Sequence, residues 1–181
     1  MKRKAIISFI ITVVLLTGCT SSNDVVSRNY ELENVMEDNA NNESYIYRAE
    51  AAAVPEVAET IQQDSEPVET SAEDDERMFL VYEDRTIQVM EDPEQPQDSL
   101  VEVSEKEFVK NNYSPSLLET YAIYRIIRGL YNMGNQDRDR EYQGYVTTGG
   151  NYHRNPGETG SNRSGSVNSK GTRGGGPGSG K

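Results

Sequence analysis

The sequence predicts a mostly disordered chain with one small α+β module between an acidic tether and a glycine-rich tail. Three observations lead to this fold class. Only 34% of the 181 residues are hydrophobic, the formal net charge is −12, and the mean hydropathy is −0.75. Segments with few apolar residues and a high net charge cannot bury enough surface to offset the entropy lost on ordering. We therefore expect order only where apolar residues cluster.

Residues 1–18 have the pattern of a secretory signal peptide, which is removed from the mature protein. Three cationic residues, Lys2, Arg3 and Lys4, precede an apolar run from Ala5 to Leu16. A positive start, a short apolar stretch and an exit through small residues are typical of such signals. The run is well short of the ~20 residues that a membrane-spanning helix needs.

The signal ends in Leu16-Thr17-Gly18-Cys19, which resembles the lipobox of bacterial lipoproteins at every position. The resemblance implies cleavage between Gly18 and Cys19 and attachment of diacylglycerol to the Cys19 thiol, with N-acylation of Cys19 also possible. Cys19 is the only Cys in the chain, and a lone free thiol would be a liability in an oxidising compartment. Stable anchoring takes about two acyl chains, which diacylglycerol would supply. The alternative is an incidental thiol in an ordinary signal.

This resemblance predicts a lipid-anchored protein of the bacterial cell envelope. In double-membrane bacteria, lipoproteins kept in the inner membrane often carry Asp after the acceptor Cys, whereas this chain has Thr20. The analogy favours the outer membrane if the host has two membranes. Otherwise we expect the outer face of the cell membrane.

Residues 19–76 are expected to form the lipidated N-terminus and an acidic, disordered tether. Between Thr20 and Glu107 there are 25 acidic and 5 basic residues. Charged linkers repel themselves and extend. The regular spacing of a calcium-binding loop is missing, so we interpret the carboxylates as solvated.

Residues 77–134 are expected to form the small α+β module. Two β-prone runs, Met78–Tyr82 and Thr86–Met90, are separated by three residues and predict a hairpin. Leu100–Val103 could add a third short strand. Ser104 precedes Glu107 at the spacing of a capping box, which predicts a short helix to about Lys110. A helix of about 18 residues follows and runs to about Met133, where Gly134 ends it. Ser114 is one candidate N-cap, and Ser116 with Glu119 is a rival capping box.

The apolar surface of the longer helix is wider than two or three short strands can cover. A module of about 55 residues is also marginal on its own. We therefore hypothesise that part of the helix docks an unknown envelope protein or a second copy, through Tyr121, Tyr124, Ile127 and Tyr131. The alternative is that all of this surface is internal core.

Residues 135–181 are rich in Gly, Ser, Asn and Arg and predict a flexible tail. Arg and Tyr among the glycines can make weak contacts with an acidic polymer, but the density of basic residues is low and we expect no nucleic-acid partner. Gly175–Lys181 has the spacing of a phosphate-binding loop, but no helix follows it, so the match is coincidental.

The sequence predicts no enzyme activity, no cofactor and no metal site. His153 is the only His, so a zinc or copper site lacks partners. A pair of carboxylates acting on a glycan would need a rigid cleft. We expect a membrane-anchored lipoprotein that acts as a non-enzymatic interaction or assembly protein. The alternatives are a surface-exclusion or immunity lipoprotein of a prophage or mobile element, and a small glycan-binding protein.

Overall fold

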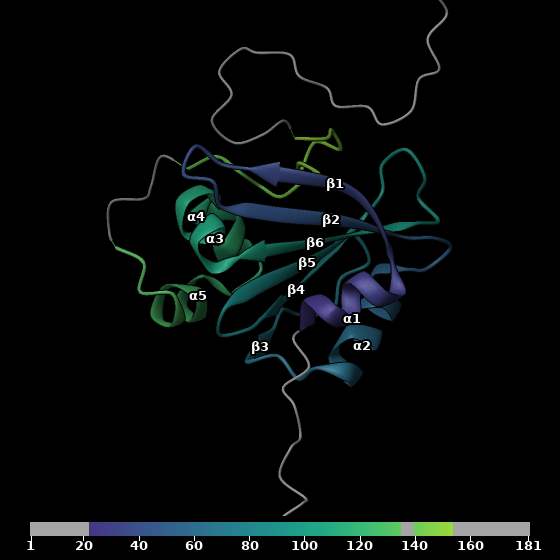
Figure 1. Ribbon diagram of the computed structural model, residues 1–181, viewed down its shortest axis with the longest axis horizontal. Helices are drawn as coiled ribbons and strands as arrows, with labels where there is room; N and C mark the ends of the chain where they lie inside the picture. The colour runs from purple at the N-terminus through teal and green to yellow at the C-terminus, as the bar shows by residue number, and fades with distance from the viewer. Residues whose placement is uncertain (1–21, 135–139, 154–181) are drawn as a thin grey trace, which may run out of the picture.

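A six-stranded antiparallel sheet forms the centre of the computed structural model, which describes residues 22–134 and 140–153 (Figure 1). The strand order is β1-β2-β6-β5-β4-β3. The strands are β1 (Glu31–Glu37), β2 (Glu43–Ala49), β3 (Glu69–Thr70), β4 (Arg77–Val81), β5 (Arg85–Glu91) and β6 (Ser99–Glu105). The prediction of a mostly disordered chain is therefore wrong.

Helices cover both faces of the sheet. Those in the described residues are α1 (Ser22–Asn29), α2 (Val54–Asp64), α3 (Lys106–Asn112), α4 (Pro115–Thr120) and α5 (Tyr124–Leu130). α1 and α2 pack together on one face, where Val26, Val57 and Ile61 meet side chains of the central strands. The other three helices pack on the opposite face around Phe79 and Phe108. Figure 1 shows the two groups of helices on separate sides of the strands.

The expected acidic tether is folded from Ser22 onward and supplies α1, β1, β2, α2 and β3. The high charge of this region predicted disorder. The region nevertheless folds, because β1 is an edge strand and can keep its charged side chains in water. Only Met36 of its seven residues is buried, so the Glu side chains of β1 keep their contact with water while the backbone pairs with β2. Charged residues on an edge strand also discourage pairing with other chains.

The predicted hairpin is present as β4 and β5, with Leu80 opposite Ile87. The expected third strand is β6, which pairs with β5 on one side and with β2 on the other. The pairing with β2 brings Val101 opposite Tyr47. The hairpin and third strand are thus the middle of a larger sheet, and β4 is buried along its whole length.

The expected helix of about 18 residues is wrong, because the segment forms two short helices, α4 and α5. Ala122 lies between them with a φ of 59°, in the left-handed region. Its N–H donates to the Glu119 carbonyl, and the Ile123 N–H donates to the Leu118 carbonyl, each at 3.0 Å, which closes α4. The break lets Leu118 and Ile127 both reach the core. The predicted short helix corresponds to α3.

Residues 140–153 correct the expected tail, because they pack on the face that carries α3, α4 and α5. Tyr142 and Val146 are buried in that core. Short bridges join Tyr142 to Tyr113 and Val146 to Tyr152. The rest of the expected tail, residues 135–139 and 154–181, lies outside the described residues, as do residues 1–21.

Candidate functional site

The predicted cleavage and lipidation residues, Gly18 and Cys19, lie outside the described residues. The described fold begins three positions later, at Ser22 of α1. A chain spans at most ~3.3–3.6 Å per residue, so Cys19 can be at most roughly 10 Å from the start of the domain. A long tether at this point is excluded.

The four residues predicted to dock a partner do not share an open surface. Ile127 and Tyr131 are fully buried in the core, where a partner cannot reach them. The Tyr131 hydroxyl is hydrogen-bonded to the Thr86 hydroxyl at 2.9 Å. Tyr121 is half-buried and packs its ring 5.0 Å from that of Phe79, and Tyr124 is half-buried as well.

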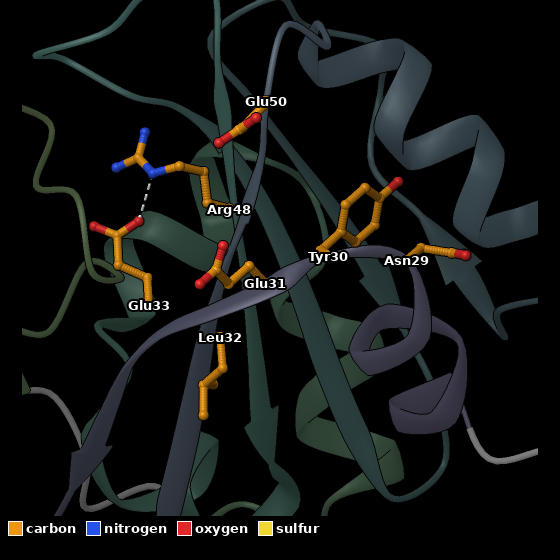
Figure 2. Close-up of a pocket in the computed structure, with 7 residues that line it drawn as sticks. All are labelled: Asn29, Tyr30, Glu31, Leu32, Glu33, Arg48 and Glu50. Atoms are coloured by element: carbon orange, nitrogen blue, oxygen red, sulfur yellow. Dashed lines mark ion pairs between the residues drawn. The ribbon is translucent and has the colours of Figure 1, made fainter.

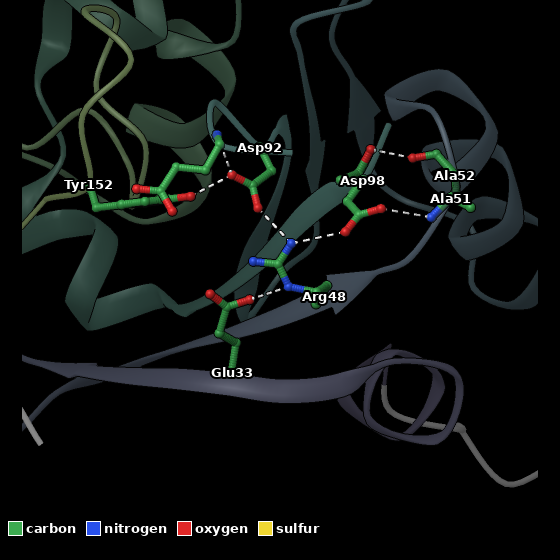
Figure 3. A network of polar contacts seen from close by, with 9 residues as sticks. Glu33, Arg48, Ala51, Ala52, Asp92, Asp98 and Tyr152 are labelled. Atoms are coloured by element: carbon green, nitrogen blue, oxygen red, sulfur yellow. Dashed lines mark hydrogen bonds and ion pairs between the residues drawn. The ribbon is translucent and has the colours of Figure 1, made fainter. Parts of the chain in front are cut away.

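A polar cluster around Arg48 joins four separate parts of the fold (Figure 3). Arg48 lies on β2, and its Nε is 2.8 Å from Glu33 Oε2 on β1. Its Nη1 is 2.6 Å from Asp92 Oδ2 and 3.1 Å from Asp98 Oδ2, at the two ends of the loop between β5 and β6. The Tyr152 hydroxyl donates to the other oxygen of Asp92. The cluster therefore fixes the end of the described C-terminal segment to the sheet.

The charges of this cluster are mutually compensated. Burial alone would raise the pKa of Asp92, but hydrogen bonds from Tyr152, the Glu94 N–H and Arg48 outweigh it, and the pKa is lowered. The pKa of Tyr152 is raised by burial and by its hydrogen bond to the Asp92 carboxylate. Both shifts keep Asp92 ionised and Tyr152 protonated. Such an arrangement holds structure in place, whereas a general acid or base needs a pKa near the working pH.

A hollow of about 520 Å³ lies beside this cluster at the β1 edge of the sheet (Figure 2). Arg48 and Glu33 belong to its wall, together with Glu31, Glu50 and Tyr30. The carboxylates make it a polar hollow with an excess of negative charge. Across residues 22–134 and 140–153, no group of three or more His, Cys, Asp or Glu is placed to hold a metal ion.

A second polar cluster, which the sequence analysis missed, surrounds Glu102 in the core. Glu102 lies on β6 and is 0% exposed. Its Oε1 accepts hydrogen bonds from the hydroxyls of Tyr142 at 2.7 Å, Ser44 at 2.8 Å and Ser104 at 3.2 Å. Its Oε2 accepts one from the Tyr145 N–H at 2.7 Å. One sequence feature could have indicated this cluster: a charged residue stands within the apolar run Leu100–Val103. The alternation of side chains along a strand places position 102 on the same inner side as Leu100.

Arg77 is the buried cation of the same face, with 5% exposure. Its Nη2 donates to the Val146 carbonyl at 2.6 Å, and burial lowers the pKa of the guanidinium. With its amide oxygen toward Arg77, Gln88 accepts from Arg77 Nη1 at 2.7 Å and donates to the Tyr113 hydroxyl at 3.1 Å. Buried charges thus hold residues 142–146 against the sheet from β4 and from β6.

A second hollow, of about 790 Å³, opens where α4 begins and the C-terminal segment passes. Its wall includes Ser114, Glu119, Arg140 and His153. The His153 ring packs 4.8 Å from the ring of the buried Tyr142. This hollow is therefore on the face of the sheet opposite to α1 and α2.

The chain belongs to the family described as "Domain of unknown function (DUF4247)", whose match covers residues 10–181. The matched region includes Leu16–Cys19 as well as the whole described fold. No curated protein and no solved structure matches the chain. None of the helices within the described residues combines the length and apolar character needed to cross a membrane.

Proposed function

We propose that this chain is a lipid-anchored protein of the bacterial cell envelope that acts as a non-enzymatic interaction or assembly protein. One observation carries the proposal: the lipobox-like Leu16-Thr17-Gly18-Cys19 ends an apolar signal and stands directly before a folded domain that starts at Ser22. Acylation at Cys19 would place the lipid at the point where the chain enters the fold. Diacylglycerol provides the two chains that stable anchoring requires.

The state of the polar clusters supports binding in preference to catalysis. The Arg48 guanidinium is engaged by three carboxylates. The Glu102 carboxylate is inaccessible to a substrate and accepts four hydrogen bonds from the chain itself. A catalytic acid or base must reach the proton that it transfers. These groups stabilise a rigid scaffold, which is what an interaction domain needs.

The proposal is tested by expressing the full-length chain and its Cys19→Ser variant in a bacterial host with labelled fatty acid. We expect the parent chain to be labelled, shortened to begin at Cys19 and recovered with membranes. The variant should lose the label and retain its signal, because the acceptor sulfur is gone. Thr20→Ser is the matched control and should behave like the parent. Unchanged labelling and processing in the Cys19→Ser variant would disprove lipid anchoring.

The interaction role is tested separately, with a photo-crosslinking side chain in intact cells at Ile126, which is 37% exposed on α5. The half-buried Tyr124, two residues before Ile126 in α5, provides a second site. We expect one envelope protein, or a second copy of this chain, to be recovered from Ile126 reproducibly. Recovery of no protein from either position would contradict an interaction surface on this face.

A further inference from the structure

An apolar strip lies beside α1 on the face of the sheet that carries α1 and α2. Among the described residues, four large aliphatic side chains are exposed by more than a third, and two of them lie on β1, Leu32 at 49% and Val35 at 38%. Leu32 is opposite Tyr47 and Val35 is opposite Tyr45 in the register with β2. Directly opposed residues of an antiparallel pair project to the same face. Tyr45 and Tyr47 belong to the apolar layer under α1 and α2, so Leu32 and Val35 flank that layer.

The strip is extended by two tyrosines and ends at carboxylates. Tyr30 and Tyr45 are half-buried against the layer under α1 and α2. The Tyr45 hydroxyl donates to Glu43, which lies opposite Glu37 at the far end of the two strands. The strip therefore runs from the end of α1 to the pair of carboxylates formed by Glu37 and Glu43. Figure 2 shows Leu32 on β1 near the point where α1 ends at Asn29.

The strip lies one short helix away from Ser22, where the described part of the chain begins. Thr20 and Ser21 alone separate Cys19 from α1, and α1 has 8 residues, or about 12 Å at 1.5 Å per residue. Residues 142–153 and the helices α3, α4 and α5 lie on the opposite face. The start of the fold and the apolar strip thus share one face, and the described C-terminal end is on the other.

We propose that the occupant of this strip is the lipid surface itself: when Cys19 is anchored, Leu32 and Val35 enter the membrane interface, and the face with α3, α4 and α5 points away from the bilayer. This inference rests on the proposed lipid anchor. Tyr45 and Tyr30 fit such a position, because tyrosine rings are enriched where hydrocarbon meets the headgroups. The exposed Arg28 at the end of α1 supplies a cation for lipid phosphates.

The strip binds only as a supplement to the anchor. Two aliphatic side chains bury little area, and membrane binding scales with buried apolar area and with attraction to anionic lipids. Glu37 and Glu43 at the end of the strip oppose such attraction. The hollow that Leu32 and Tyr30 line has further carboxylates in its wall, those of Glu31, Glu33 and Glu50, and these oppose it as well. An anchor at Cys19 compensates because it holds the strip at a high effective concentration next to the surface.

The absence of Trp and the single Cys of the chain permit a direct test. The mature chain, residues 19–181, is coupled through Cys19 to maleimide-bearing lipid in phosphatidylcholine vesicles whose acyl chains are brominated. Leu32→Trp and Val35→Trp each introduce the only Trp, and Ile126→Trp on α5 is the matched exposed control. We expect the fluorescence at positions 32 and 35 to fall by about half or more and to shift to shorter wavelength, and that at position 126 to stay unchanged.

Equal quenching at all three positions, or none at positions 32 and 35, would overturn the proposal. Quenching of the uncoupled variants at positions 32 and 35 would also contradict it, because the strip is expected to need the anchor. The unsubstituted chain provides a second measurement that does not depend on the variants folding. Spin-labelled lipid should broaden the amide resonances of Leu32 and Val35 more than those of α5. Because the coupling is chemical, these results are independent of whether cells acylate Cys19.

Discussion

Arg48 Nη1 lies 2.6 Å from Asp92 Oδ2, and the Asp92 side chain is fully buried. This ion pair connects β2, near the edge of the sheet, to the loop that leads from β5 to β6. The same carboxylate accepts a hydrogen bond from the Tyr152 hydroxyl. One buried carboxylate thereby joins the first part of the fold to the described end of the chain.

Replacing Arg48 by Ala should destabilise the fold by about 3 kcal/mol, because removal of one partner leaves a buried charge uncompensated. Urea denaturation followed by circular dichroism measures the change. Arg125, an exposed arginine on α5, supplies the control, and Arg125→Ala should stay within about 0.5 kcal/mol of the parent. Equal stability of the two variants would show that the cluster contributes little.

Tyr142→Phe should cost about 1–2 kcal/mol, because it removes a hydroxyl donor from the buried Glu102 carboxylate and leaves the ring in place. Tyr124→Phe is the comparison at a half-buried site and should have almost no effect. The same denaturation experiment measures both. The interpretation of Glu102 as a fixing point fails if the two substitutions cost the same.

Replacing two different glycines by alanine should change the stability of the fold in opposite directions. Gly144 has a φ of +97°, and a Cβ there would lie 2.4 Å from the nearest atom of the Gln88 side-chain amide, so Gly144→Ala should destabilise the fold by about 1–3 kcal/mol. Gly129 is in α5 with nothing within 4 Å of an added Cβ, so Gly129→Ala should stabilise by about 0.5–1 kcal/mol. Thermal unfolding of both variants checks the signs. A stabilising Gly144→Ala would contradict the close approach of residue 144 to Gln88.

Asp38 should make stability depend on pH at acid values. Burial acts to raise its pKa, but hydrogen bonds from the Asn42 side chain and N–H, from Asn112 and from the Ala40 N–H together lower the pKa to about 2. A carboxyl whose pKa is depressed on folding contributes stability above its unfolded pKa of ~3.9, and that contribution is lost as the pH falls toward 2.

Asp38→Asn removes this titration, so its free energy of unfolding should change less between pH 4 and pH 2 than that of the parent. Urea denaturation across this range measures the difference. Glu56→Gln, on the exposed side of α2, should leave the pH dependence of the parent intact. Parallel pH profiles for the parent and Asp38→Asn would show that Asp38 has no such role.

The central part of the sheet could be predicted from the sequence, and its edge could not. Runs such as Met78–Tyr82 are apolar throughout because β4 is covered on both faces, and this pattern is visible locally. β1 carries Glu at three of its seven positions and buries only Met36. Its stability comes from pairing with β2, and that pairing is a property of the tertiary structure.

The polar clusters were hidden for a related reason. Glu102 and Arg77 are far apart in sequence from the residues that satisfy them, Tyr142 and Val146. In the overall composition, both charges are evidence against a folded core. A buried charge is nevertheless tolerated when it is fully hydrogen-bonded. The count of apolar residues therefore underestimated how much of the chain folds.

The sequence by itself determined the hairpin of β4 and β5, the third strand β6 and the lipobox-like ending at Cys19, because each of these is a pattern of adjacent residues. Only the tertiary structure decided that the acidic region from Ser22 joins the sheet, that Ala122 divides the expected long helix, and that residues 140–153 close one face. The physical reason is that these features depend on partners distant in the chain: backbone pairing of a charged edge strand, burial of two apolar groups at once, and hydrogen bonds to buried charges.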